Sequence, residues 1–194
     1  LIDGLERYGE VASVEALLGH NPPSWSSLSA RLIEVDGRLA YLLWSYDISS
    51  HKRLEGQLRE LATTDALTGL SNRRSFLDKG VALLEHCRRH RQPCTVLMLD
   101  IDHFKSINDR FGHQVGDEAL IACAQALRET LRESDVVGRL GGEEFGAVLP
   151  LAEGQAAWET AERARLAVHS LRLPMANGQT LGFTGSIGLA SLER

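Results

Sequence analysis

Cysteine is scarce in this sequence and lacks the spacing that would give it a structural role. The three cysteines, Cys87, Cys94 and Cys123, form no CxxC pair and lie in apolar stretches. The sequence therefore predicts neither a disulfide framework nor a zinc site. We expect a protein of the reducing cytoplasm.

Long apolar runs and excess positive charge are also absent. No stretch of the 194 residues approaches the roughly 18 apolar residues that cross a bilayer, and the acidic, glycine-containing start is unlike a signal peptide. An anchor outside this sequence stays open. The formal net charge of −5 and the pI near 5.8 argue against bulk binding to DNA or RNA, which requires a basic surface. Any phosphate is therefore expected to be handled locally, with a metal.

The composition is that of a folded protein. Hydrophobic residues make up 43% of the chain and charged residues 24%, ordinary values for a globular protein. A chain of 194 residues is long enough for one complete domain and part of a second. We predict a partial N-terminal domain over residues 1–48, a linker over 49–64 and a larger domain over 65–194.

The first segment with a clear pattern is a β-hairpin. Residues 31–35 and 38–46 are strand-like runs joined by Asp36-Gly37, a pair that suits the positive φ of a tight turn. Residues 25–49 resemble the closing strands and exit motif of a PAS sensor domain. This resemblance implies that a sensor, of which only the end is recognisable, controls the domain that follows.

The linker is predicted to be an amphipathic helix. Leu54, Leu58 and Leu61 recur at helical spacing among charged residues. Two interpretations stay open: the leucines lie on their own domain, or they form the seam of a parallel two-chain coiled coil. The position between two domains favours the coiled coil and hence a homodimer.

The remainder alternates between helical and strand patterns. Asn72 is suited to cap the first helix, because its side chain can accept a hydrogen bond from an unpaired backbone N–H. Predicted helices cover 72–90, 115–131 and 155–171, and predicted strands cover 94–101, 136–140, 145–149 and 181–190. This order predicts an α/β fold in which helices flank one central mixed sheet.

Acidic residues stand at two points where strands end. Asp100 closes the apolar run 94–101, and Glu143 and Glu144 follow two glycines in the turn after 136–140. If the two strands are neighbours, Glu143 can face Asp100 across one Mg²⁺, which prefers one or two carboxylates together with phosphate oxygens. Taken singly, each feature has an ordinary explanation, a strand ending in solvent or a simple β-turn.

Three motifs occur in order: Asp65-x-Leu67-Thr68-x-Leu70-x-Asn72-Arg73-Arg74; Asp100-x-Asp102-x-Phe104-Lys105-x-x-Asn108-Asp109-x-Phe111-Gly112-His113-x-x-Gly116-Asp117; and Gly141-Gly142-Glu143-Glu144-Phe145. From about residue 65 the chain resembles the GGDEF family of diguanylate cyclase domains, in the GGEEF form. The resemblance implies a nucleotidyl-cyclase-like, palm-like fold. It also implies condensation of two GTP molecules into cyclic di-GMP and two pyrophosphates, with Mg²⁺ or Mn²⁺.

The resemblance also implies roles for individual residues. The metal ligands would be Asp100, the backbone carbonyl of Ile101 and Glu143, with Glu144 as a further candidate, and Glu143 would accept the proton. Substrate contacts would come from Phe104, Lys105, Asn108, His113, Asp117, Gly141 and Gly142. An ionised Asp117 can accept the two donors of guanine, whereas adenine offers an acceptor at N1. Helix capping is the alternative role for Asn108 and Asp117.

A product-binding site is the last feature that the resemblance implies. Arg132 and Asp135 match the RxxD inhibitory motif, and Arg139 and Arg163 are expected to join them. Arginine matches the N7 and O6 acceptors of guanine, and the alternative is a surface ion pair of at most about 1 kcal/mol. The family continues beyond the strand 181–190, so the C-terminal end of the domain is expected to be missing.

Two other functions stay open. A degenerate domain would bind GTP or cyclic di-GMP as a receptor without turnover, and a cyclase with relaxed base choice would accept other nucleotides. The intact Asp100 and the intact glycine–acid turn favour the active cyclase over the receptor. Asp117 argues against relaxed base choice.

Overall fold

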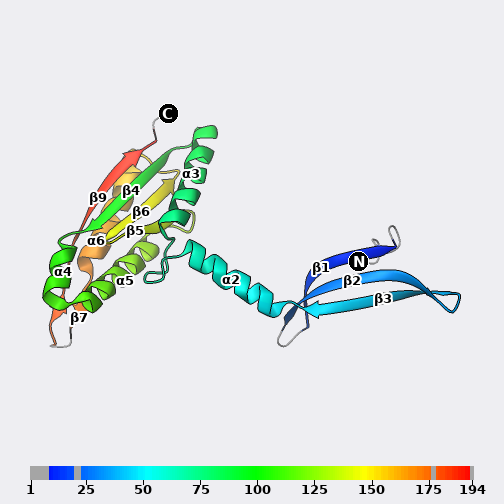
Figure 1. Cartoon of the computed structure of the whole chain (residues 1–194). Helices are drawn as coiled ribbons and strands as arrows, with labels where there is room; N and C mark the ends of the chain where they lie inside the picture. The colour runs from blue at the N-terminus through cyan, green and yellow to red at the C-terminus, as the bar shows by residue number, and fades with distance from the viewer. Residues whose placement is uncertain (1–8, 20–22, 176–177, 193–194) are drawn as a thin grey trace. The chain divides into compact units, whose positions relative to one another are not determined.

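The computed structural model describes residues 9–19, 23–175 and 178–192 (Figure 1). The chain divides into two compact units, residues 1–60 and 61–194. Within the described ranges, no helix combines the length and the apolar character needed to cross a membrane.

The N-terminal unit contains a three-stranded antiparallel sheet in the order β1-β2-β3. Strands β2 (Ser24–Val35) and β3 (Arg38–Asp47) form the predicted hairpin. Both residues of its turn have positive φ, 52° at Asp36 and 74° at Gly37, as the Asp-Gly pair predicted. The hairpin is therefore confirmed, and its strands are longer than expected.

Strand β1 (Glu10–Leu18) was not predicted. Its pairing with β2 shifts register between Val11 and Val14, and Ser13 there has a φ of 52°. A bulge of this kind interrupts the period-2 alternation by which a strand is recognised. The alternation of apolar and polar residues therefore does not indicate this strand.

The linker helix α2 (Ser49–Thr63) is confirmed. It begins where the carboxylate of Asp47 accepts a hydrogen bond from the backbone N–H of Ser49 (2.8 Å). The side chains of Leu54, Leu58 and Leu61 are all exposed in the single chain. Whether they form a coiled-coil seam stays a prediction.

The C-terminal unit is built on a four-stranded sheet in the order β5-β6-β4-β9. Its strands are β4 (Cys94–Ile101), β5 (Val136–Gly141), β6 (Glu144–Pro150) and β9 (Gly185–Ser191). The α/β class is confirmed, but every pair in this sheet is antiparallel, so the expectation of a mixed sheet was wrong. A continuous apolar run predicts a strand buried on both faces, but it does not reveal the direction of the neighbouring strands, and one face of β4 is exposed at Met98 and Asp100.

Four helices surround this sheet: α3 (Arg73–Arg89), α4 (Phe104–Phe111), α5 (His113–Thr130) and α6 (Gly154–Ser170). The Asn72 cap is confirmed, because its Oδ1 accepts a hydrogen bond from the N–H of Ser75 (2.9 Å). Helix α4 was not predicted, because eight residues are too few for a clear period.

The predicted strand 181–190 begins later than expected. Residue Leu181 belongs to β8 (Thr180–Leu181), which pairs with β7 (Leu173–Pro174) in a separate small sheet. Phe183, in the irregular segment between β8 and β9, is buried. The strand-like pattern of apolar residues therefore extends over the irregular segment that separates β8 from β9 (Gly185–Ser191).

The core lies on both faces of the sheet. Buried residues such as Leu97, Leu99 and Phe145 belong to one cluster together with residues of α4, α5 and α6. A smaller cluster joins α3 to the sheet and consists of the buried residues Phe76, Cys87, Cys94 and Val148. Helix α3 packs mainly over β5 and β6. The side chain of Met98 on β4 stays 42% exposed, so this part of the sheet is open.

Substitution of Gly138 by alanine is expected to destabilise the C-terminal unit by about 1–3 kcal/mol, a typical cost of overpacking. A Cβ at this position would lie 2.7 Å from the Cβ of Phe76 and 2.8 Å from the carbonyl oxygen of Ser71. Urea unfolding measures the effect. Gly188→Ala is the control, because its Cβ would meet no atom within 4 Å. Equal stabilities for the two variants would contradict the packing argument.

Candidate functional site

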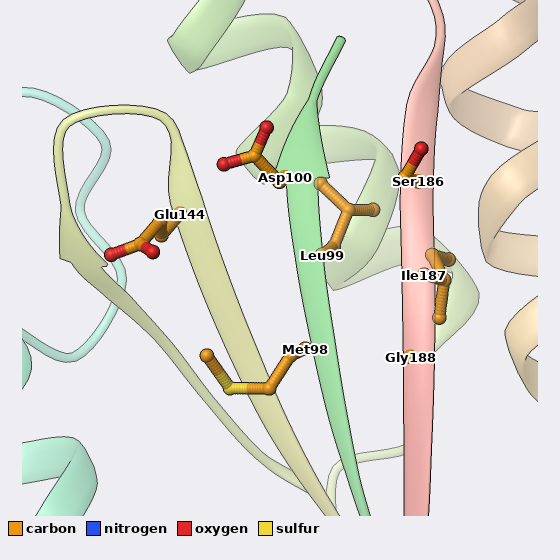
Figure 2. A pocket seen from close by; sticks show the side chains of 7 residues that line it. All are labelled: Met98, Leu99, Asp100, Glu144, Ser186, Ile187 and Gly188. Carbon is orange, nitrogen blue, oxygen red and sulfur yellow. The ribbon is translucent and has the colours of Figure 1, made fainter.

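Two carboxylates face each other at the ends of neighbouring strands. In the antiparallel pairing of β4 with β6, Asp100 lies directly opposite Glu144. Figure 2 shows both side chains projecting to the same side of these strands. Directly opposed residues of a sheet have Cβ atoms about 5 Å apart, so the two acids share one small region.

The third acid, Glu143, belongs to the same region. Its backbone carbonyl accepts a hydrogen bond from the N–H of Ile101 (3.3 Å), the residue after Asp100. Burial, followed by the negative charges of Glu143 and Glu144, raises the pKa of Asp100. The predicted juxtaposition of Asp100 with the glycine–acid turn is therefore present.

A shallow cleft of about 320 Å³ lies beside these acids, between β4, β6 and β9 (Figure 2). It is lined by Met98, Leu99, Asp100, Glu144, Ser186, Ile187 and Gly188. Glu144 thus occupies the position facing Asp100 that the sequence pattern gave to Glu143. The contribution of β9 was also missed, because nothing in the sequence indicates that β9 pairs with β4.

The acids suit a divalent cation that arrives with phosphate. Among the residues described, no three acidic, histidine or cysteine side chains already converge on a metal-binding geometry. Mg²⁺ usually takes one or two protein carboxylates and completes its shell with water and substrate phosphates. Burial and then repulsion by Glu143 and Glu144 raise the pKa of Asp100, and a cation would relieve that repulsion. The donor set therefore fits Mg²⁺ or Mn²⁺.

Asp102 has a structural role. Its carboxylate accepts hydrogen bonds from the hydroxyls of Ser186 (2.6 Å) and Thr184 (2.5 Å), and its N–H donates to the carbonyl of Thr184 (3.0 Å). The hydrogen bond from Ser186 and then that from Thr184 lower the pKa of Asp102. This second acid of the motif therefore ties the end of β4 to the start of β9.

A sharp turn leads from β4 into α4. His103, the residue before the helix, has a φ of 57°, which is unusual for a residue with a Cβ. The helix then starts with Phe104, which is buried, and Lys105, which is exposed. The first N–H groups of a helix lack partners within it and attract anions.

The residues expected to bind the base come together where α4 meets α5. A Cβ on Gly116 would lie 2.0 Å from Oδ1 of Asn108, so the amide of Asn108 rests against this glycine. Asp117 is the next residue and is exposed. His113, the first residue of α5, is also exposed. Gly112 joins the two helices with a φ of 86°.

The RxxD segment forms a compact turn beside α6. The backbone N–H of Arg132 donates to the carboxylate of Asp135 (2.8 Å), and both residues line a small cavity of about 40 Å³ together with Thr160 of α6. Arg163 donates to the carbonyl of Thr130 (3.3 Å). Arg132 and Asp135 are thus in contact, and Arg163 reaches the last residue of α5, two positions before Arg132.

The fourth residue, Arg139, points elsewhere. Its guanidinium contacts Asp65 and the carbonyl of Gly142, so its donors are used by Asp65 and by the turn between β5 and β6. A product-binding role for Arg139 stays a prediction. The sequence offered one indication of this contact: Asp65 begins the first of the three motifs, and Arg139 lies two residues before the third.

Comparison with known proteins shows the family of the C-terminal unit. A family model described as GGDEF, diguanylate cyclase, GGDEF domain, matches residues 62–194. The chain is 41% identical over 146 residues to the probable diguanylate cyclase DgcC of Escherichia coli, covering 75% of this chain and 38% of that protein. It is 40% identical over 134 residues to the cyclic di-GMP phosphodiesterase NbdA of Pseudomonas aeruginosa, covering 69% of this chain and 17% of that protein.

A solved structure is similar over the same region. The coiled coil and GGDEF domain of DgcB from Caulobacter crescentus, crystallised in complex with c-di-GMP, matches with a TM-score of 0.71 and 29% identity. The match covers 75% of this chain and 78% of that one. The chain itself spans well under half the length of the two curated relatives.

Asp102→Asn is expected to lower the stability of the C-terminal unit in a pH-dependent way. The folded-state pKa of Asp102 is depressed, so its contribution is fully present above the unfolded-state pKa of about 3.9 and is lost as pH falls through the folded-state pKa. The stability gap between wild type and variant should therefore narrow below about pH 4. Denaturant unfolding across this range measures it.

The control for that experiment is Asp109→Asn, which removes an exposed carboxylate of α4. Asp109→Asn should show the same dependence of the free energy of unfolding on pH as wild type. A gap between wild type and Asp102→Asn that stays constant at every pH would contradict a role for the ionised carboxylate.

Proposed function

Since the chain belongs to the GGDEF family of diguanylate cyclase domains, we propose that it condenses two molecules of GTP into cyclic di-GMP and two pyrophosphates. One observation carries the proposal: Asp100 lies directly opposite Glu144 and beside Glu143, where two neighbouring strands end. Membership of the family supports a catalytic use of these acids.

The acids hold the cation that neutralises the phosphates. Asp100 and Glu143 would be its ligands together with the carbonyl of Ile101, and Glu144, which faces Asp100, would be a further candidate. Mg²⁺ or Mn²⁺ bound there would balance charge on the phosphates and make the attacking hydroxyl more acidic.

The chain also orients the phosphates through its backbone. Gly141 and Gly142 have φ values of 148° and 51°, a region that favours glycine, and a Cβ on either would meet no atom within 4 Å. The turn can therefore approach a nucleotide closely. The N–H groups at Phe104 and Lys105, where α4 begins, would donate to phosphate oxygens.

The base is selected where α4 meets α5. Asp117 would accept hydrogen bonds from N1–H and N2–H of guanine, and Asn108, held against Gly116, would contact the base beside it. Adenine has an acceptor at N1 and would face the carboxylate unfavourably. His113 lies at the start of α5, near the same junction. GTP is therefore preferred over ATP.

The reaction joins two nucleotides through a 3′-hydroxyl and an α-phosphate. The hydroxyl oxygen of one GTP forms a bond to the α-phosphorus of the other as the bond from that phosphorus to the pyrophosphate oxygen breaks. The hydroxyl proton passes to the carboxylate of Glu143, which lies in the same acidic cluster as Asp100. A second, equivalent step closes the ring.

Two chains are needed, because each domain holds one nucleotide and the reacting atoms must approach each other. The exposed stripe of Leu54, Leu58 and Leu61 on α2 supports a dimer through this helix. The PAS-like N-terminal part would then control how the two cyclase domains meet.

A receptor that binds GTP or cyclic di-GMP without turnover is the second candidate. The relative NbdA carries the name of a phosphodiesterase at 40% identity, so family membership alone does not imply turnover. The intact acids at Asp100 and Glu143 favour the cyclase, and the following experiment separates the two.

Wild-type protein incubated with GTP and Mg²⁺ is expected to release cyclic di-GMP, detected by chromatography. Glu143→Gln should lower kcat by about 10²–10⁴, the usual contribution of a positioned base, and Asp100→Asn, which removes a proposed metal ligand, should also lower kcat. The control Asp78→Asn, an exposed carboxylate on α3, should keep full activity. Folded wild type that binds GTP but yields no product would establish the receptor instead.

We also expect product inhibition at Arg132, Asp135 and Arg163. Loss of a charge-assisted hydrogen bond costs about 1.5–3 kcal/mol, so Arg132→Ala should raise the inhibitory concentration of cyclic di-GMP by about tenfold or more. Glu133→Ala changes a variable position of the motif, keeps Arg132 and Asp135, and should leave inhibition unchanged. An unaltered inhibition curve for Arg132→Ala would reject this site.

A further inference from the structure

The catalytic turn is held by a side chain to which the proposed reaction gives no role. Arg139 lies on β5, just before Gly141 and Gly142, and its side chain is only 15% exposed. Its Nε and Nη2 atoms both donate to the carbonyl of Gly142, at 3.0 and 2.8 Å. A guanidinium that donates two hydrogen bonds to one carbonyl fixes the orientation of that carbonyl.

This contact fixes one side of Glu143. The peptide group before Glu143 carries the Gly142 carbonyl, which Arg139 holds. The peptide group after it carries the Glu143 carbonyl, which accepts from the N–H of Ile101 (3.3 Å). Since each peptide group is planar, anchoring both leaves the backbone of Glu143 little freedom. The side chain of Glu143, whose charge acts on Asp100, therefore projects from a fixed point of the backbone.

Arg139 is itself oriented by Asp65. Its Nη1 lies 3.2 and 3.4 Å from the two carboxylate oxygens of Asp65. Asp65 also accepts hydrogen bonds from the N–H and the hydroxyl of Thr68, at 2.9 and 2.7 Å. Partial burial alone would raise the pKa of Asp65, but the hydrogen bonds from Thr68 and Arg139 bring it below its usual value. The carboxylate therefore stays ionised.

The segment around Asp65 begins where α2 ends. Asn72 donates its N–H to the carbonyl of Thr63 (3.0 Å) and its amide to the carbonyl of Ala62 (3.0 Å). Arg139 also donates its own N–H to the carbonyl of Ser71 (2.9 Å). A continuous series of hydrogen bonds thus joins the last turn of α2 to the glycine turn.

We propose that Arg139 is a positioning residue for the cyclase reaction, that it holds Glu143 in place through the Gly142 carbonyl, and that Asp65 acts through Arg139. This inference rests on the proposed function. Lysine cannot replace the arginine, because a single ammonium cannot grip Gly142 with two donors and reach Asp65 at the same time.

The test compares Arg139→Ala and Arg139→Lys with Arg128→Ala. Arg128 is a matched control, because it also donates to a backbone carbonyl of the segment after α2, that of Gly69 (2.8 Å), but does not contact the glycine turn. Misplacement of a reacting group by about 1 Å can cost roughly 10²-fold in rate. We expect Arg139→Ala to lower kcat at least about tenfold and Arg139→Lys to recover only part of it.

Binding should change less than the reaction rate. With Mg²⁺ and 3′-deoxy-GTP, which lacks the attacking hydroxyl, the Kd should rise by a smaller factor than kcat falls, because Asp100 and the Ile101 carbonyl would still hold the cation, whereas Glu143 also accepts the proton. Asp65→Asn should lower kcat in the wild type and have no further effect in Arg139→Ala, as expected for two residues that act as one unit. Arg128→Ala should keep kcat. Equal losses for Arg139→Ala and Arg128→Ala, or a fully active Arg139→Ala, would overturn the inference.

Hydrogen exchange of residues 141–145, followed by mass spectrometry, separates this inference from the proposed function. Amide exchange in the turn should be faster in Arg139→Ala than in wild type and unchanged in Arg128→Ala. If wild type makes no cyclic di-GMP, the proposed function fails, and the exchange of the turn still decides whether Arg139 holds it. Unchanged exchange in Arg139→Ala would reject the positioning role.

Discussion

The site depends on the antiparallel pairing of β4 with β6, which brings Asp100 opposite Glu144. Like charges directly opposed in a sheet repel each other, and this repulsion contributes to the raised pKa of Asp100. The pairing persists because the next pair along the strands, Leu99 with Phe145, is buried in the core. Apolar burial therefore keeps the two acids together against their mutual repulsion.

The same sheet decides which surface stays open. Helix α3 packs mainly over β5 and β6, whereas α4, α5 and α6 share the core cluster with the buried residues of β4. The strip of β4 that carries Met98 and Asp100 is exposed. A cleft forms there because two faces of the sheet are covered unequally, and the ends of β4 and β6 supply its charged rim.

Features governed by short-range rules were predicted correctly. Asp36-Gly37 turns the hairpin and Asn72 caps α3, since both depend on a residue and its immediate neighbours. Two elements escaped prediction for equally local reasons. A bulge interrupts the alternation of β1, and α4 is too short to show a helical period. The prediction of a mixed sheet around β4 was wrong because apolar composition carries no information about strand direction.

By itself, the sequence determined the α/β class, the order of most elements and the acidic residues of the site, because each follows from composition and spacing along one segment. Only the tertiary structure decided which acid faces which. It aligned Glu144 with Asp100, turned Asp102 toward Ser186 and Thr184, and directed Arg139 to Asp65 and Gly142. These contacts join residues up to 84 positions apart. They are set by strand register and helix packing, which no local pattern encodes.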